Sequence, residues 1–224
     1  MALETPLDVA AEDTESQSAA LPQRVFGKTG ERVPILGLGT APGGMGLQNE
    51  DAIRLYHRAL DLGVSYLDTA PGYERAQIQL GEVMKDRRDE AFLVTKTHVA
   101  DGKRAREILE ESLRTLQTDH VDLTFVHTVG NLHVDAVLAT DGSLAALQDA
   151  REEGMTRYIG FTAHNGPWKA AKILQEREVD ALMVAINPGE RHTYNFEGEV
   201  LPLAVAQNAA VAAMKVDGGA RNMK

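Results

Sequence analysis

Apolar and polar positions repeat with two different periods along the chain. From Arg24 onward, short apolar runs of strand length are separated by longer segments whose apolar residues recur every three or four positions. The first pattern predicts buried strands and the second predicts amphipathic helices. Regular alternation of the two predicts a parallel sheet, because each helix returns the chain to the edge where the next strand begins.

The apolar runs predict seven strands, at 34–38, 64–68, 92–96, 121–127, 158–162, 181–186 and 211–214. Helices are predicted between them, at 49–63, 76–85, 103–116, 143–154, from 167 onward, and 197–207. Asn49 is a preferred helix N-cap residue and Gly63 a preferred stop, so both support the first helix. Composition does not change along this stretch, so we expect one domain at 25–224.

Seven consecutive strand–helix units favour a (β/α) barrel of the TIM type over an open doubly wound sheet. A closed barrel takes eight strands and typically about 250 residues, whereas this chain reaches Lys224 soon after its seventh predicted strand. The sequence therefore predicts a barrel with seven of its eight units, lacking strand eight and the C-terminal helices. Such a sheet has open edges, and unpaired edges favour self-association.

Composition excludes several classes of protein. The formal net charge is −10, so the chain lacks the basic surface that nucleic acid or anionic membrane requires. It has no cysteine, which excludes disulfides and thiolate metal sites, and no apolar run near the roughly 20 residues of a membrane span. Residues 1–24 are acidic and Ser/Ala-rich without the features of a secretory signal. We expect a disordered N-terminal tail and a cytoplasmic protein.

Ionisable residues stand at the ends of three consecutive predicted strands. Asp68, Lys96 and His127 each follow apolar or aromatic residues on the same strand face. Taken singly, each is more often a solvated strand end or a structural side chain. Because parallel strands deliver their carboxyl ends to the same rim, the shared register predicts that the three meet there. Tyr73 lies five residues after Asp68, in the loop beyond that strand.

These four side chains have a coherent joint chemistry. A tyrosine hydroxyl, with an ordinary pKa near ~10, is a poor proton donor at neutral pH unless a nearby ammonium stabilises its phenolate. A carboxylate keeps that ammonium charged and in place, and an imidazole can hydrogen-bond a substrate carbonyl. The set suits protonation of a carbonyl oxygen. Nothing in it supplies the carbon-bound hydrogen, so a hydride-carrying cofactor is implied.

With these motifs in order, the sequence resembles the aldo-keto reductase family. The matching segments are LGLGTA at 36–41, YLDTAPGY at 66–73, VTKT at 94–97, VDLTFVH at 121–127 and GMTRYIGFT at 154–162. They span about Arg24 to Lys215. The resemblance implies an oxidoreductase that reduces small aldehydes or ketones with NADPH, NADH not being excluded.

The resemblance also implies roles for single residues. Tyr73 would be the general acid, Lys96 the cation that stabilises its phenolate, Asp68 the anchor of that lysine, and His127 the group that orients the carbonyl. Residues expected near the nicotinamide end of the cofactor are Gly39, Thr40, Asp68, Thr162 and Met214.

The chain departs from the family pattern at several of its positions. Glu74 replaces a usual Gly, Ala76-Gln77 a usual Ser-Glu pair, and Ala163 a usual Asn. Met183 stands where a Gln is common, and Met214 where many members stack an aromatic ring on the nicotinamide. A thioether can still pack against that ring.

Three other interpretations stay open at this point. Gly37, Gly39, Gly43 and Gly44 resemble a Rossmann dinucleotide loop, but residues 45–48 separate them from the next predicted helix. A class I aldolase would use Lys96 as its Schiff-base nucleophile. An inactive or fragmentary family member would act as a binding module.

Overall fold

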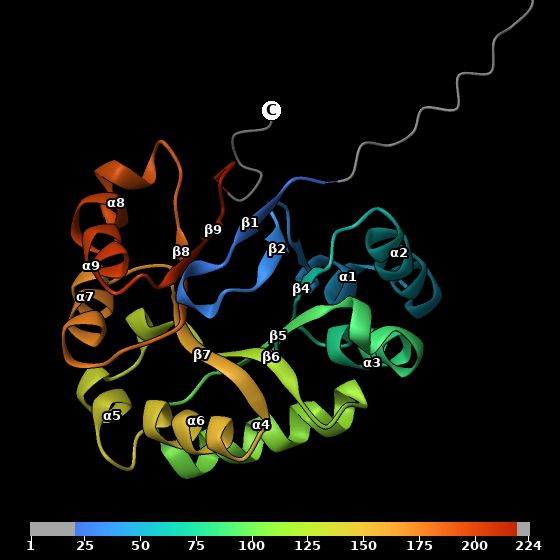
Figure 1. Cartoon of the computed structure of the whole chain (residues 1–224), viewed down its shortest axis with the longest axis horizontal. Helices are drawn as coiled ribbons and strands as arrows, with labels where there is room; N and C mark the ends of the chain where they lie inside the picture. Colours follow the sequence, from blue (N-terminus) through green and yellow to red (C-terminus); the bar gives the residue numbers. More distant parts are fainter. Residues whose placement is uncertain (1–20, 219–224) are drawn as a thin grey trace, which may run out of the picture.

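A computed structural model describes residues 21–218, and its centre is a curved parallel sheet (Figure 1). Seven strands pair in the order in which they occur along the chain. They are β3 (Leu38–Gly39), β4 (Tyr66–Asp68), β5 (Phe92–Thr97), β6 (Val121–Val126), β7 (Thr156–Ala163), β8 (Ala181–Ala185) and β9 (Ala210–Met214). All six pairings are parallel, as in a TIM-type barrel. Within residues 21–218, β3 and β9 each pair with one strand only.

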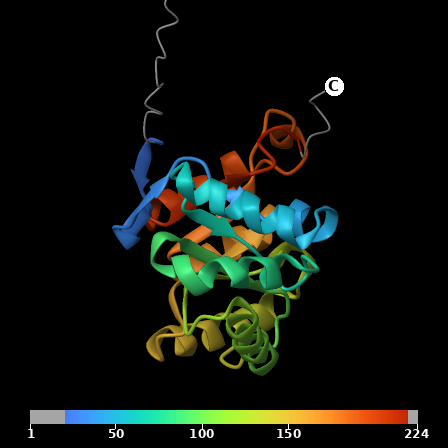
Figure 2. The same ribbon diagram turned by 90° about the vertical axis from the view of Figure 1, so that its right-hand side faces the viewer.

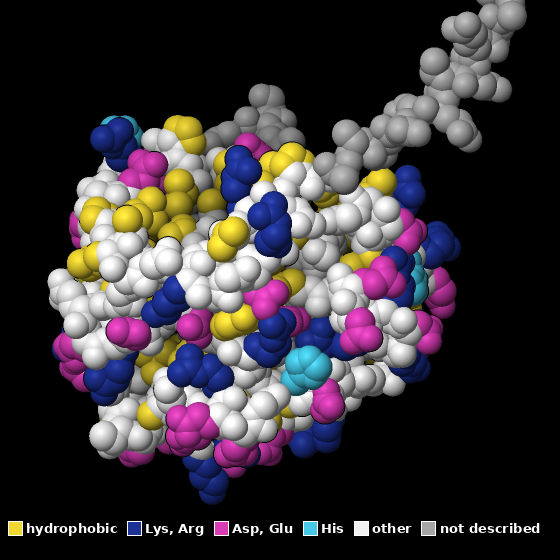
Figure 3. All heavy atoms as spheres, in the orientation of Figure 1, with side chains coloured by type: hydrophobic (Ala, Val, Ile, Leu, Met, Phe, Trp, Pro, Cys, Tyr) yellow, Lys and Arg dark blue, Asp and Glu magenta, His cyan; other side chains and the backbone are white. Residues whose placement is uncertain are grey.

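Helices cover the outer side of this sheet (Figures 1 and 2). The main ones are α2 (Asn49–Asp61), α3 (Ala76–Arg87), α4 (Gly102–Leu116), α6 (Ser143–Glu152) and α7 (Pro167–Glu176). Shorter helices are α1 (Ala41–Gly46), α5 (Val134–Leu138), α8 (Phe196–Glu199) and α9 (Leu201–Ala206). No helix in the described range is long and apolar enough to cross a membrane. Acidic and basic side chains are interspersed over the face seen in Figure 3.

Apolar side chains pack on both sides of the strands. One cluster lies between sheet and helices, and a second, smaller one fills the inside of the curved sheet. The inner cluster begins with Phe26, Tyr66 and Phe92, whose rings lie within 5.9 Å of one another, centroid to centroid. Tyr66 and Phe92 are the first residues of β4 and β5. Aromatic packing therefore occupies the N-terminal end of the inner side of the sheet.

A hairpin at the start of the described chain corrects the first predicted strand. The segment 34–38 is not one strand: Pro34 ends β2 (Arg32–Pro34), which pairs antiparallel with β1 (Gln23–Val25), and β3 follows separately. A β-hairpin and a parallel strand share the same alternation, so the sequence pattern did not separate them. Residues 23–24 of the predicted tail belong to β1, and 1–20 lie outside the described residues.

Helix boundaries differ from the predictions at three places. Asn49 is the first residue of α2 rather than its cap, and its Oδ1 accepts a hydrogen bond from Gln79 Nε2 at 3.1 Å. The predicted helix 197–207 is interrupted, because α8 ends at Glu199 and α9 begins anew with Pro202 in its first turn. The short α5 was not predicted.

The glycine-rich segment after β3 also differs from expectation. Gly43 and Gly44 lie inside α1, so the expectation that residues 45–48 separate these glycines from the next helix is wrong. The sequential strand order nevertheless excludes a Rossmann sheet, whose order reverses at a switch point.

Candidate active site

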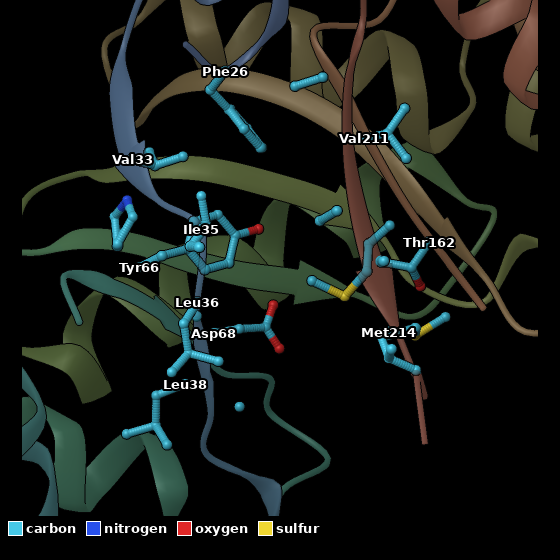
Figure 4. A pocket seen from close by; sticks show the side chains of 18 of the residues that line it. Phe26, Val33, Ile35, Leu36, Leu38, Tyr66, Asp68, Thr162, Val211 and Met214 are labelled. Atoms are coloured by element: carbon cyan, nitrogen blue, oxygen red, sulfur yellow. The ribbon is translucent and has the colours of Figure 1, made fainter. Parts of the chain in front are cut away.

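Four side chains from successive strand ends line one cavity. Asp68 ends β4, Lys96 lies near the end of β5, His127 follows β6, and Tyr73 lies in the turn after β4. All four line a cavity of about 800 Å³. In Figure 4, Leu36 and Leu38 lie on one side of this cavity and Met214 on the other, with Asp68 between them. The structure thus brings together the residues that the sequence placed at a common rim.

Lys96 and Asp68 form a buried ion pair. Lys96 is 1% exposed, and its Nζ donates to Asp68 Oδ1 at 2.5 Å and to the carbonyl of Thr69 at 2.8 Å. Burial raises the pKa of the Asp68 carboxyl, and the Lys96 ammonium opposes that rise. Asp68 Oδ2 is buried without a hydrogen-bond partner in the described chain. The interaction with Lys96 therefore offsets most of the cost of burying the Asp68 carboxylate.

Tyr73 meets this pair through its ring. The Lys96 ammonium lies 4.9 Å from the centroid of the ring, and the His127 ring stands edge-on at a centroid distance of 6.1 Å. Within residues 21–218, no hydrogen bond joins the phenol oxygen to the ammonium, whose bonds go to Asp68 and Thr69. The positive charge and the tyrosine are adjacent, with the charge facing the ring.

His127 is held in its neutral form. Burial lowers its pKa to about 3, and the positive charge of Lys96 and the neighbouring rings of His164 and His98 act in the same direction. A neutral imidazole has one N–H donor and one acceptor nitrogen. At physiological pH His127 can donate a hydrogen bond to a carbonyl oxygen without carrying charge itself.

Three of the residues expected at the cofactor line the cavity, besides Asp68: Gly39, Thr162 and Met214. Thr162 is fully buried, and its Oγ1 accepts a hydrogen bond from the backbone N–H of Thr128 at 2.8 Å. Thr40 does not line the cavity. Its backbone N–H and its Oγ1 both donate to the Asp68 carbonyl, at 2.9 and 3.0 Å, so it braces the end of β4.

Two further lining residues were not selected from the sequence. His164 directly follows β7, and Lys215 directly follows β9. Burial lowers the pKa of His164, and the charges of Lys215 and Lys96 lower it further. Both occupy the strand-end position that singled out His127, so the same rule applied to β7 and β9 identifies them.

Comparison with known proteins gives a family match over most of the chain. The profile described as "Aldo/keto reductase family" matches residues 35–220. Methylglyoxal reductase DkgA of Escherichia coli is 37% identical over 134 residues, which is 58% of this chain and 46% of that protein. The chain spans about half the length of curated relatives that it matches.

Solved structures share the fold. A putative aldo-keto reductase from Pseudomonas aeruginosa is 28% identical with a TM-score of 0.76, covering 86% of this chain and 77% of that one. An aldo-keto reductase from Klebsiella pneumoniae in complex with NADPH is 23% identical with a TM-score of 0.72, covering 88% and 69%. At that identity, the second shows the fold alone.

Proposed function

This chain belongs to the aldo/keto reductase family of oxidoreductases, and we propose that it reduces aldehydes or ketones to alcohols, or catalyses the reverse, with NADPH. The observation that carries the proposal is the buried Lys96–Asp68 pair beside Tyr73 and His127 in one cavity. The names of relatives such as methylglyoxal reductase support carbonyl reduction.

We assign the nicotinamide ring to the part of the cavity that holds Asp68, Lys96 and His127. The whole cavity, of about 800 Å³, also extends to Phe26 and Val33 near the N-terminal hairpin. Gly39, Thr162 and Met214 would hold the nicotinamide end, and Met183 of the neighbouring strand β8 lines the same cavity. When bound, the cofactor supplies the hydride that the side chains lack. We propose NADPH because a solved relative of the same fold carries it.

The side chains have separate tasks in this mechanism. His127, being neutral, donates its N–H to the carbonyl oxygen and orients it. Tyr73 gives its hydroxyl proton to that oxygen as negative charge develops there. Lys96 stabilises the resulting phenolate through its positive charge 4.9 Å from the ring centroid. Asp68 keeps the ammonium charged and fixed.

Lys96 is poorly suited to act as a Schiff-base nucleophile. Such a lysine needs a neutral, accessible amine. Here the ammonium is 1% exposed and donates to a carboxylate and to a carbonyl. We therefore do not propose an aldolase.

Binding and turnover test the proposal separately. Titration with NADPH, followed by isothermal titration calorimetry, should show saturable binding to the chain and to Tyr73→Phe. Carbonyl-dependent NADPH oxidation should be present in the chain and lost in Tyr73→Phe. Absence of any response at millimolar NADPH would refute the cofactor assignment, and full turnover in Tyr73→Phe would refute the role of Tyr73.

A further inference from the structure

The segment that carries Tyr73 is fastened to α1 by a single arginine. We propose that Arg75 is a positioning residue, which holds the backbone of Tyr73 against α1 so that the phenol keeps its place beside Lys96. The inference rests on the proposed function, since it concerns how the proton donor is held. Arg75 itself does not line the cavity, so any effect on the chemistry must act through Tyr73.

The guanidinium of Arg75 binds the end of α1. Its Nη2 donates to the carbonyl of Leu47 at 2.8 Å, and its Nε faces the carbonyl of Gly44 at 3.4 Å. The last carbonyls of a helix have no partner within the helix. The rigid guanidinium of an arginine has several N–H donors and can bond two such carbonyls at once. The ammonium of a lysine matches this arrangement less well.

The backbone of α1 also contacts the segment that carries Tyr73 directly. A Cβ at Gly44 would lie 2.1 Å from the Tyr73 carbonyl oxygen, 2.7 Å from the Ala76 nitrogen and 2.8 Å from the Ala76 Cβ. Real Cβ atoms do not approach so closely, so the contact exists only because residue 44 is glycine. The backbone of α1 is thus packed onto the peptide that carries the tyrosine.

The tyrosine has few other restraints. Its ring contacts Lys96 and His127 without a hydrogen bond to either, within the described chain. Its backbone N–H donates to Ala70 and its carbonyl accepts from Ala76, both at 3.0 Å. The next residue, Glu74, has a φ of +49°, a left-handed conformation unfavourable for a side chain of this kind. External packing must therefore hold the turn, and the α1 contact provides it.

Helix α1, to which Arg75 binds, is itself anchored to the core. Gln79 Nε2 faces the carbonyl of Gly43 in α1 at 3.4 Å, and the hydroxyl of buried Tyr56 lies 3.3 Å from Gln79 Oε1. Gly43 leaves the space that this hydroxyl occupies, since a Cβ there would lie 2.3 Å from it. Arg75 therefore connects Tyr73 to a fixed element rather than to a free loop.

The test compares two arginines with the same kind of contact. Arg177 also donates from Nη2 to a carbonyl at the end of a short helix, that of Leu138 in α5, at 2.8 Å, and it does not line the cavity. Arg75→Met should lower kcat about 10- to 100-fold with little change in the KM for the carbonyl, since a displacement near 1 Å can cost that much. Arg75→Lys should recover part of the loss. Arg177→Met should lose a similar amount of thermal stability while retaining kcat.

Amide hydrogen exchange gives a second readout that does not need turnover. Arg75→Met should speed exchange at residues 44–47 and 73–76, and Arg177→Met should not. Wild-type exchange at 73–76 in Arg75→Met, or a kcat equal to that of Arg177→Met, would overturn the inference. If the unaltered chain shows no carbonyl-dependent NADPH oxidation, the proposed function fails, and the exchange data still decide whether Arg75 holds Tyr73.

Discussion

Removing the ammonium of Lys96 should expose how strongly the site depends on its buried ion pair. Lys96→Met keeps the length and apolar stem of the side chain but leaves Asp68, which is 7% exposed, without its cation. Its Oδ1 then loses the 2.5 Å contact, and its Oδ2 is already unpartnered in the described chain. Leaving one charge of a buried pair uncompensated typically costs about 3–5 kcal/mol, so we expect the free energy of unfolding to decrease by this amount at pH 8.

The loss should depend on pH in a definite direction. Burial already raises the pKa of Asp68, and removal of Lys96 removes the effect that opposes the rise. In the variant, the folded state therefore binds a proton at a higher pH than the unfolded state does. Its stability should increase as the pH falls through that window, by at most about 1.4 kcal/mol per pH unit. The deficit relative to the unaltered chain is thus smaller near pH ~5 than at pH 8.

Urea unfolding followed by circular dichroism, repeated across this pH range, measures the effect. Lys169→Met is the matched control, because Lys169 Nζ donates to the carbonyls of Gly130 and Leu132, at 2.8 and 2.7 Å, and binds no carboxylate among residues 21–218. Its destabilisation should not vary with pH. Adding Asp68→Asn to Lys96→Met should restore part of the stability. A Lys96→Met loss under about 1 kcal/mol at pH 8, or one as constant with pH as the control, would refute this account of the pair.

Three other predictions concern strain, protonation and the open edges. Glu74→Gly should stabilise the chain by about 0.5–1 kcal/mol. Glycine adopts the left-handed conformation of residue 74 without strain, and this gain exceeds the cost of the greater conformational entropy that glycine gives the unfolded chain. A lower midpoint of urea unfolding would contradict this. The free energy of unfolding should fall as the pH drops below about 6.5. The pKa of His127, about 3, and the lowered pKa of His164 keep both rings neutral in the folded chain, whereas the unfolded chain takes up protons. In calorimetry, His127→Gln should reduce this dependence on pH. We also propose that the chain self-associates through the edges of β3 and β9. Exposed apolar side chains lie there, Ile35 and Leu36 just before β3 and Val211 on β9. A monodisperse monomer in light scattering would contradict this proposal.

The positions of Asp68, Lys96 and His127 could be predicted because one simple rule governs them. In a parallel sheet, side-chain alternation determines on which face of the sheet each residue lies. The common strand direction determines at which end of the sheet the last residue of each strand lies. The inner cluster contains Tyr66, Phe92, Val94, Leu123 and Phe125, which are the residues preceding those three on the same faces. Nothing beyond sequence periodicity was needed to bring these strand ends together.

Other parts of the site depend on contacts that no local pattern contains. The hydrogen bond from Thr40 to the Asp68 carbonyl joins the residue after β3 to the end of β4. The hydrogen bond from Arg75 to Leu47, just after α1, spans 28 residues. The hairpin of β1 and β2 was missed because its short alternating segments match the start of a parallel strand equally well. The approach of the ammonium to the face of Tyr73, rather than to its hydroxyl, follows from the competing bonds to Asp68 and Thr69.

The most direct test of the account follows the hydrogen itself. The chain is mixed with an aldehyde and with NADPH in which both hydrogens at C4 of the nicotinamide are deuterium, and the alcohol is examined by mass spectrometry. We predict one deuterium on the carbinol carbon of the product from the unaltered chain, and no product from Tyr73→Phe. An alcohol without deuterium, or equal amounts of product from both proteins, would contradict the claim that Tyr73 protonates a carbonyl as the cofactor reduces it.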